Sequence, residues 1–313
     1  MLEFYNDVYN LETKKRFLDS IDLSQYPPRW WERVFEKSYG FENIRQKDLY
    51  AFTVSEILEF YKFLDIGTIT PLIVYNSNLI KYAQWALNEN LITDGQNHFD
   101  ELNNESLYTC INKSKINASI LSHEQFMELI HTKIKNDQDK YVFFCLYEGV
   151  KGKDYQEIID LRLADIDEKN SVAHLSSGRE VYVSQDFINI CKEADKQREY
   201  VTLGSDMRLF PLIPGENIFK EKHNSRGSAL NRSVYNTIIR NISDIYQLSD
   251  VITAKSIMDS GLIYYLKRRA EKLDISVTDL IYNVENWKDI AEKYRFNQTT
   301  KKRWMLQYSD IFK

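Results

Sequence analysis

The sequence predicts a mostly α-helical protein with two domains, and three observations support this fold class. Apolar residues recur at helical spacing along most of the chain, and residues able to cap a helix precede several of these runs. Only one segment alternates apolar and polar residues around a turn, as a β-hairpin does. The 313 residues suffice for two domains that each bury a core. We therefore expect a helical N-terminal domain and an α-rich C-terminal domain with a small β-hairpin or sheet.

The first helix with a clear start signal lies at residues 53–64. Thr53 and Glu56 form a capping-box pattern, in which the hydroxyl and the carboxylate each accept a hydrogen bond from an unpaired backbone N–H group. The apolar run that follows extends through Leu64.

A second helix is expected to run from Thr70-Pro71 to about Asn90, because threonine caps helices and proline suits the first turn. Its core face consists of apolar residues at helical spacing: Leu72, Leu79, Ala83 and Ala86. Other sides carry polar residues: Ser77, Asn78, Lys81 and Gln84. This polar face is either simply solvated or able to enter a groove of a nucleic acid.

Residues 93–120 separate the two domains. They are polar, with Gly95, several asparagines and alternating charges, and indicate an interdomain linker with room for one short ordered piece. The predicted domains are therefore 1–92 and 121–313.

The second domain begins with another capping box, formed by Ser122 and Gln125. The hairpin follows later, where SVAHL and REVYV alternate around the turn Ser176-Ser177-Gly178. Helices are expected near 123–135, 139–148, 155–163, 185–198, 232–246, 254–272, 277–284, 286–294 and 300–311.

Composition excludes several classes of protein. Hydrophobic residues make up 43% and aromatic residues 13%, so a folded chain is expected and disorder is not. The apolar runs, such as Tyr141–Leu146 and Leu262–Leu266, are too short to span a bilayer, and the N-terminus lacks a signal-peptide pattern. The three cysteines are odd in number and widely spaced, which argues against disulfides and favours the cytoplasm: Cys110, Cys145 and Cys191.

No cofactor or metal is expected. The histidines lack the spacing of metal ligands: His98, His123, His131, His174 and His223. The sequence also contains no Gly-rich phosphate loop and no Gly-x-Ser-x-Gly motif.

The net charge of −5 weighs against a simple nucleic-acid binder. Phosphate contacts, however, depend on charge within about one Debye length, roughly 8–10 Å, and not on the sum. Basic residues gather in three places: Arg226–Arg240, Lys267–Arg269 and Lys301–Arg303. A basic surface therefore remains compatible with the composition.

Residues 149–167 read GVKGKDYQEIIDLRLADID. This segment resembles the first box of the tyrosine recombinase or phage integrase family, in which Gly-x-Arg leads into Glu-Leu-x-x-Leu-x-x-x-Asp-Ile-Asp. The residues that fit are Glu157, Leu161, Asp165, Ile166 and Asp167. Asp154 stands where the family has an arginine three residues before the glutamate, with Lys151 and Lys153 nearby.

The segment ITAKSIMDSGLIYYL (252–266) resembles the family box Thr-Pro-His-x-Leu-Arg-His. Lys255 then stands at the first histidine, Met258 at the arginine and Asp259 at the second histidine. A preceding segment, 224–244, resembles the family's polar loop that enters a helix.

The segment YRFNQTTKKRW (294–304) resembles the last box, Gly-His-x-Ser-x-x-x-Thr-x-x-Tyr. Arg295 then takes the histidine position and Trp304 the position of the nucleophilic tyrosine. The resemblance is loose before residue 120 and better over 122–311. It implies a helical core-binding domain followed by an integrase-like catalytic-type domain.

The chemistry of strand cleavage explains why these replacements matter. A phenolate must attack phosphorus while two guanidinium groups stabilise the added charge and an imidazole moves protons. Loss of one such donor typically costs about 10²–10³ in rate, and aspartate or methionine cannot replace arginine's planar fork. The resemblance thus implies a DNA-binding scaffold without recombinase activity. Tyr308, one helical turn after Trp304, is either a displaced nucleophile or an aromatic of the core.

Several residues remain suited to DNA, although each could equally be a solvated surface charge. Lys151 and Lys153 lie in a Gly-containing loop before a helix, where backbone N–H groups and lysine charge can meet an anion. The full set of expected DNA contacts is Ser77, Asn78, Lys81, Lys151, Lys153, Arg179, Arg226, Arg232, Lys255, Lys301, Lys302 and Arg303.

Residues 287–304 also partly resemble a helix-turn-helix motif. Arg295 replaces the usual turn glycine, and Lys301 stands where an apolar residue is common. This alternative would direct a nearby set of side chains toward DNA: Thr299, Thr300 and Lys302.

Two phrases, YEGVKGKDYQEIIDLRLADID (147–167) and IKYAQWALNENLI (80–92), resemble the integrase-like lysogeny repressors of SPβ-type phages. The resemblance implies a sequence-specific repressor in a bacterial cytoplasm, whose two domains clamp a double-stranded DNA operator. A regulatory peptide or protein is a further candidate partner. The sequence does not fix the oligomeric state.

Two other functions stay open at this point. One is an active or accessory recombinase that attacks with Tyr308. The other is an interaction protein that binds no DNA, which the negative net charge permits.

Overall fold

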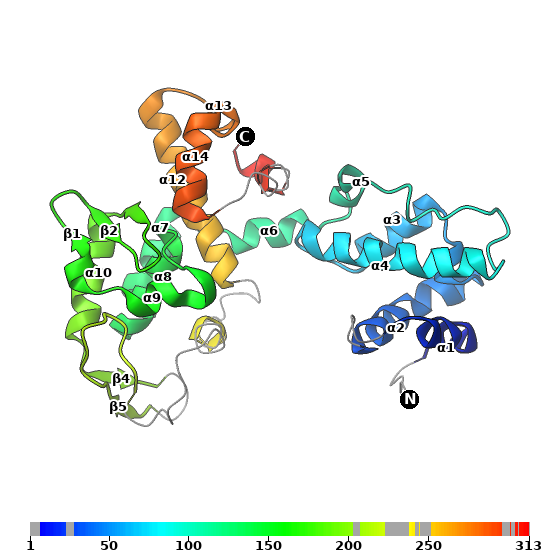
Figure 1. The fold of residues 1–313 in the computed structure, drawn as a ribbon, viewed down its shortest axis with the longest axis horizontal. Coiled ribbons are helices and arrows are strands. Elements are labelled where there is room, and N and C mark those ends of the chain that lie inside the picture. Colours follow the sequence, from blue (N-terminus) through cyan, green and yellow to red (C-terminus); the bar gives the residue numbers. More distant parts are fainter. Residues whose placement is uncertain are drawn as a thin grey trace. The chain divides into compact units, whose positions relative to one another are not determined.

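The computed structural model describes residues 7–22, 28–202, 207–222, 238–241, 244, 252–295, 301, 304–305 and 307–312. The chain forms two compact units. The N-terminal unit comprises Met1–Ile116 with Leu306–Tyr308, and the C-terminal unit comprises Asn117–Met305 with Ser309–Lys313. Helices dominate both units, and the strands are few and short (Figure 1). The expected mostly α fold class is confirmed.

The N-terminal unit is helical in its described part and packs around aromatic side chains. The Phe17 ring lies 4.9 Å from the Trp31 ring and 4.8 Å from the Tyr82 ring, and all three side chains are buried. Its helices are α1 (Leu11–Ser20), α2 (Pro28–Arg45), η1 (Leu49–Ala51), α3 (Val54–Phe63), α4 (Ile69–Asn88), α5 (Asn104–Tyr108) and α6 (Lys113–Ser119), the last of which crosses the boundary between the units.

The predicted capping box of α3 is confirmed. The Thr53 backbone N–H donates to Glu56 Oε2 at 2.8 Å, and the Glu56 backbone N–H donates to Thr53 Oγ1 at 3.4 Å. The two residues thus satisfy each other's unpaired donors at the start of the helix.

Helix α4 begins slightly before the predicted start, since Thr68 holds the cap position and Thr70 already lies in the first turn. The predicted core face is confirmed, because its residues are fully buried: Leu72, Leu79, Ala83 and Ala86. Asn78 was expected on another side but is only 3% exposed. It lies one turn before the buried Tyr82, so the buried face is wider than the apolar pattern indicated.

Residues 93–116, which the sequence assigned to a linker, pack against the rest of the N-terminal unit. Buried residues of this segment include Phe99 and Leu107. The Asn76 side chain of α4 donates to the Phe99 carbonyl at 3.1 Å and accepts from the Tyr61 hydroxyl at 3.0 Å. Polar composition conceals this packing because only a few apolar side chains anchor the segment.

The C-terminal unit is built around α8, whose residues Tyr141–Tyr147 are all buried. Helices α10 and α12 pack against α8. The helical elements are α7 (His123–Glu128), η2 (Leu129–Lys133), α8 (Asp137–Tyr147), η3 (Lys153–Tyr155), α9 (Gln156–Asp160), η4 (Leu163–Asp165), α10 (Gln185–Lys196), α12 (Ala254–Leu273), α13 (Val277–Tyr282), α14 (Val284–Tyr294) and η5 (Ser309–Ile311).

The predicted hairpin is confirmed as part of a three-stranded antiparallel sheet. Its strands, in spatial order, are β1 (Ile166–Asp167), β2 (Val172–His174) and β3 (Glu180–Tyr182). Gly178 closes the turn with φ +81° and donates its N–H to the Leu175 carbonyl at 2.8 Å. A second antiparallel pair, β4 (Glu199–Val201) and β5 (Leu209–Pro211), was not predicted. Each of its strands is too short to display an alternating pattern.

The other expected helices of this unit are mostly found. The prediction near 123–135 differs in that η2, a π-helical turn, follows α7, and the one near 155–163 corresponds to the shorter α9. The helix expected near 232–246 falls largely outside the described residues. In the helix expected at 300–311, residues 301, 304–305 and 307–308 are helical, and η5 follows them. In the part of the chain that the structure describes, no helix is both long and apolar enough to cross a membrane.

Candidate nucleic-acid interface

The segments that resemble the recombinase boxes meet at the C-terminal end of α8. A Cβ atom on Gly261 of α12 would lie 1.8 Å from the Tyr147 carbonyl oxygen, so α12 rests directly on the α8 backbone. Gly149, with φ +80°, also lies close to α14, where an added Cβ would be 2.7 Å from the Lys293 carbonyl oxygen. Glycine at both positions brings the first box beside the other two.

Glu157 of the first box is 1% exposed and is surrounded by donors. Its carboxylate accepts from Ser177 Oγ at 2.6 Å and from the Lys151 backbone N–H at 3.0 Å, and it pairs with Arg179 at 2.6 Å and Arg295 at 2.8 Å. Burial by itself would raise the pKa of Glu157, but hydrogen bonds from Arg179 and Ser177 and the charges of both arginines lower it. The carboxylate is therefore ionised and fully engaged.

Arg179 directs its guanidinium into the protein. Nε and Nη2 donate to Glu157, Nη1 donates to the carbonyls of Glu292 and Lys293 at 2.7 and 2.9 Å, and Nη2 also donates to the Gly149 carbonyl at 3.1 Å. These bonds use all five N–H groups of a guanidinium. Sequence analysis placed Arg179 among the DNA contacts, whereas its geometry joins the hairpin to the first box and to α14.

The loop before α9 holds Asp154, the residue that the sequence resemblance aligns with the first arginine of the family. Asp154 is exposed and has a left-handed backbone, φ +49°, followed by Tyr155 with φ +67°. Lys151 is partly buried, with its ammonium 5.2 Å from the centre of the Tyr155 ring, while Lys153 is exposed. This loop thus presents Asp154 and Lys153 side by side at the surface.

The residues that the resemblance aligns with catalytic positions in the last two boxes contact one another. Asp259 is 2% exposed, and its carboxylate pairs with Lys255 and accepts from Trp304 Nε1 at 3.1 Å. Met258 packs, partly buried, against the core of the C-terminal unit. Trp304 is 4% exposed and Tyr308 2%. The three residues that the sequence resemblance aligns with the first histidine, the second histidine and the nucleophile therefore contact one another, with Lys255 at the exposed end.

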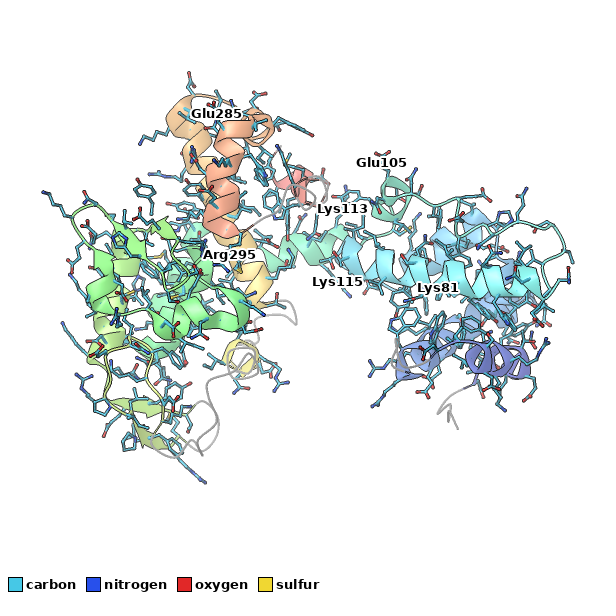
Figure 2. The ribbon with its side chains drawn as sticks, viewed as in Figure 1. Lys81, Glu105, Lys113, Lys115, Glu285 and Arg295 are labelled. Carbon is cyan, nitrogen blue, oxygen red and sulfur yellow. The ribbon has the colours of Figure 1, made fainter. Side chains whose placement is uncertain are left out.

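The remaining expected contacts lie in several places. Ser77 and Lys81 are exposed on α4, where Figure 2 labels Lys81. Lys301 lies with its ammonium 5.4 Å from the Tyr282 ring and 5.1 Å from the Trp287 ring, and partial burial lowers its pKa. Other residues fall outside the described part of the chain: Arg226, Arg232, Thr299, Thr300, Lys302 and Arg303.

Sequence reasoning missed the partners of Glu157 and Asp259. The signal for the first was present, because the resemblance aligns Glu157 with the family glutamate and places Arg179 at the hairpin. For Asp259, the sequence shows only that it follows Lys255 by four residues, which is an ordinary i, i+4 pair on a helix. The contact with Trp304 depends on the tertiary fold.

Two protein-family models match this chain, one in its N-terminal part and one in its C-terminal part. The family described as "MrpR, C-terminal catalytic domain" matches residues 120–311, and "MrpR, N-terminal core-binding domain" matches residues 8–88. A relative described as "SPbeta prophage-derived uncharacterized protein YopR", from Bacillus subtilis (strain 168), is 26% identical over 306 residues, which cover 92% of this chain and 91% of the relative.

Two solved structures also match this chain at low sequence identity. The Tn1549 transposon integrase in complex with a circular intermediate DNA is 13% identical, with a TM-score of 0.47 and 95% of both chains covered. XerA recombinase is 14% identical, with a TM-score of 0.36, and the match covers 91% of this chain and 99% of XerA. The two matched domains together span most of the sequence, and the chain therefore belongs to the MrpR family of integrase-like, SPβ-type proteins.

Proposed function

We propose that this chain is a sequence-specific DNA-binding repressor of lytic genes, built on a tyrosine recombinase scaffold that lacks recombinase activity. The observation that carries the proposal is the contact of Lys255, Asp259 and Trp304. These three residues occupy positions that in the resembling family hold two histidines and the nucleophile. Here Lys255 pairs with Asp259, and Asp259 is buried together with Trp304 while Lys255 stays exposed.

Phosphoryl transfer at this place would face two chemical obstacles. Trp304 has an indole N–H and no hydroxyl, so it can form no phosphoester, and that N–H is already donated to Asp259. Asp154 adds a negative charge where the resembling family has an arginine that would stabilise the transition state, and a carboxylate close to a phosphate raises the barrier. Both arguments support a scaffold that binds DNA and leaves it uncut.

The proposed DNA contacts are of two kinds. The exposed Ser77 and Lys81 of α4 would enter a groove and read base edges, and Lys153 would hold a phosphate in the loop before α9. The set also retains residues from the sequence resemblance: Arg226, Arg232, Lys301, Lys302 and Arg303. Residues 1–92 and 121–313 would each contribute contacts. As a repressor of a prophage, the protein would act at the nucleoid in a bacterial cytoplasm.

Gel shifts test the binding half of this proposal. The full chain is incubated with fragments of a prophage genome and of its host at a series of salt concentrations. We expect one or a few fragments to shift at salt concentrations at which the others do not, because base contacts add to the salt-dependent phosphate contacts. If no fragment shifts even at low salt, the protein does not bind DNA and an interaction protein becomes the better description.

A nicked suicide substrate containing the shifted site tests the catalytic half. We expect no covalent protein–DNA adduct from the native chain or from Trp304→Tyr, since a restored phenol still lacks both guanidinium groups. An adduct from the native chain would establish a recombinase. Its loss in Tyr308→Phe would then identify Tyr308 as the nucleophile.

A further inference from the structure

A basic pocket lies at the C-terminal end of α12, apart from the box positions. Its volume is about 770 Å³, and residues of α12 and α14 line it. Arg269, which lines the pocket, follows Lys255 by fourteen residues on the same straight helix, which corresponds to about 21 Å along the axis. The pocket is therefore separate from the positions discussed above.

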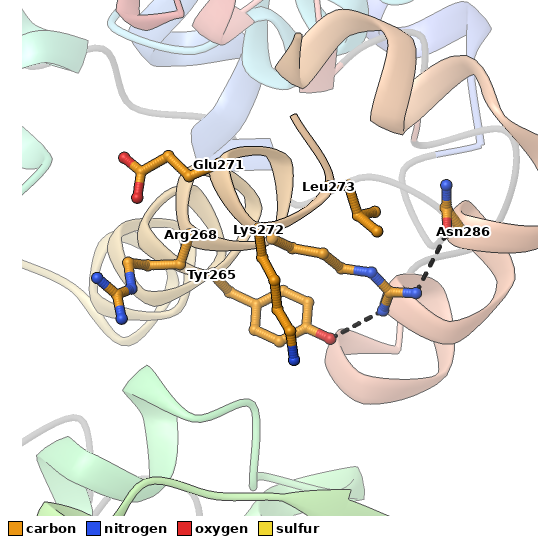
Figure 3. A pocket seen from close by; sticks show the side chains of 7 residues that line it. Tyr265, Arg268, Glu271, Lys272, Leu273 and Asn286 are labelled. Atoms are coloured by element: carbon orange, nitrogen blue, oxygen red, sulfur yellow. Dashed lines mark hydrogen bonds between the residues drawn. The ribbon is translucent and has the colours of Figure 1, made fainter. Parts of the chain in front are cut away.

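One cation of the pocket is held in place by the protein. Arg269 donates through Nη1 to the Tyr265 hydroxyl at 3.0 Å and through Nη2 to Asn286 at 3.3 Å (Figure 3). It also pairs with Asp289 at 3.0 Å. These contacts join α12 to α14 and form a polar base for the pocket. The base is thus arranged before any ligand arrives.

Two further cations of the pocket have no such partners. Arg268 and Lys272 are exposed, and neither makes a hydrogen bond or an ion pair with the described residues. Glu271 is the carboxylate among the lining residues and Asp289 already pairs with Arg269, so Arg268 and Lys272 leave the pocket with an excess of positive charge. This excess of positive charge, in a chain of net charge −5, favours an anionic ligand.

The rim of the pocket is apolar on one side. Leu273 lines the pocket and is 46% exposed, and Ile275, two residues later, is 39% exposed. A duplex backbone presents phosphates and sugars and would leave Leu273 uncovered. A peptide that carries both carboxylates and an apolar side chain would satisfy the cations and cover the leucine.

We propose that this pocket binds a short acidic peptide segment of a partner protein. Its carboxylates would pair with Arg268 and Lys272, and an apolar side chain would pack on Leu273. The volume lies within the usual range of ligand sites, about 300–1,000 Å³, and so accommodates a few side chains and not a whole domain. The site offers a means by which a partner can act on the protein without occupying the proposed DNA contacts.

Selection from a random twelve-residue peptide display library on the full chain provides the test. We expect enriched peptides to contain at least two acidic residues around an apolar one. The strongest peptide is then synthesised with a fluorescent label, and its binding is followed by fluorescence anisotropy. Arg268→Glu with Lys272→Glu should weaken binding about tenfold or more, because two attractive contacts become repulsive. Leu273→Ala should weaken it several-fold.

Lys169→Glu with Lys196→Glu is the matched control, because it changes the net charge equally at exposed lysines far from α12 in the sequence. It should leave peptide affinity unchanged within about twofold. Circular dichroism melting curves verify that every variant folds, and Arg268→Gln with Lys272→Gln replaces the charge reversal if that variant does not.

Three results would overturn the proposal. The first is a selection without acidic peptides, and the second is equal weakening by the pocket variant and the control. The third is displacement of the labelled peptide by inorganic phosphate or by mixed-sequence duplex DNA, which would assign the pocket to phosphate groups.

Discussion

At the scale of single residues, the Glu157 carboxylate accepts hydrogen bonds from two side chains and one backbone amide, and it forms an ion pair with Arg295. A buried charge is tolerated only when its partners compensate for lost hydration. Arg179 supplies the largest share of this compensation and also anchors the end of α14 through two backbone carbonyls. The pair therefore holds the hairpin, the first box and α14 together.

Replacing Arg179 with methionine is expected to destabilise the C-terminal unit by about 3–5 kcal/mol, because it leaves Glu157 buried with too few partners. Urea unfolding monitored by circular dichroism measures this change. Arg198→Met is the control, since Arg198 is exposed and its side chain, among the residues that the structure describes, donates only to the nearby carbonyls of Asp195 and Gln197. Unchanged stability together with weaker DNA binding would instead make Arg179 a phosphate contact.

At the scale of elements, a buried charged cluster joins α1, α2 and η1 in the N-terminal unit. Lys14 donates to Glu42 at 2.6 Å and to the Tyr9 carbonyl at 2.8 Å, and Tyr82 donates to Asp48 at 2.8 Å. Burial, which outweighs the charge of Lys14, raises the pKa of Glu42 from 4.5 to about 7. The elements are thus connected through a group that titrates near neutral pH.

The raised pKa of Glu42 predicts a pH dependence of stability. Between about pH 4.5 and 7 the folded state keeps a proton that the unfolded state releases, so the free energy of unfolding falls as pH rises through this window. Urea unfolding at pH 5, 6, 7 and 8 measures the trend, and Glu42→Gln should flatten it. Asp139 of the C-terminal unit, whose pKa burial raises to about 6, contributes with the same sign and remains in the variant. Identical pH profiles for both proteins would contradict the prediction.

The contact between α8 and α12 gives a second prediction at this scale. In Gly261→Ala the new methyl group would overlap the Tyr147 carbonyl, so α12 must move away from α8, at a cost of about 3 kcal/mol or more. Thermal unfolding should show a large loss. Gly40→Ala on α2 is the control, because nothing lies within 4 Å of its added Cβ and alanine favours a helix by about 0.5–1 kcal/mol. A tolerated Gly261→Ala would mean that the two helices separate easily.

At the scale of the whole molecule, a net charge of −5 means that DNA binding must rest on local cations. Lys153→Glu is expected to weaken binding to every DNA fragment and to reduce the slope of log affinity against log salt by about one. Lys81→Ala, on the proposed groove-facing side of α4, should instead change the ranking of fragments. Gel shifts over a salt series separate these outcomes. A uniform loss in Lys81→Ala would make Lys81 another phosphate contact.

The sequence by itself determined the features that depend on neighbours along the chain. These features are the capping boxes at Thr53 and Ser122, the turn at Gly178 and the core face of α4. The capping boxes and the turn are local because their hydrogen bonds span only three or four residues, and the core face follows from the helical spacing of apolar residues. The order of the boxes likewise sufficed to recognise the family.

Tertiary structure alone decided which distant side chains meet. Four features depend on contacts between segments that the sequence does not link. They are the β4–β5 pair, the burial of Asn78, the Lys14 cluster and the pairing of Arg179 with Glu157. A charged side chain looks the same in sequence whether it faces water or a buried partner, because its environment is set by packing between elements. For this reason the sequence could suggest Lys153 as a DNA contact, but it could not show that the Arg179 side chain points into the protein and pairs with Glu157.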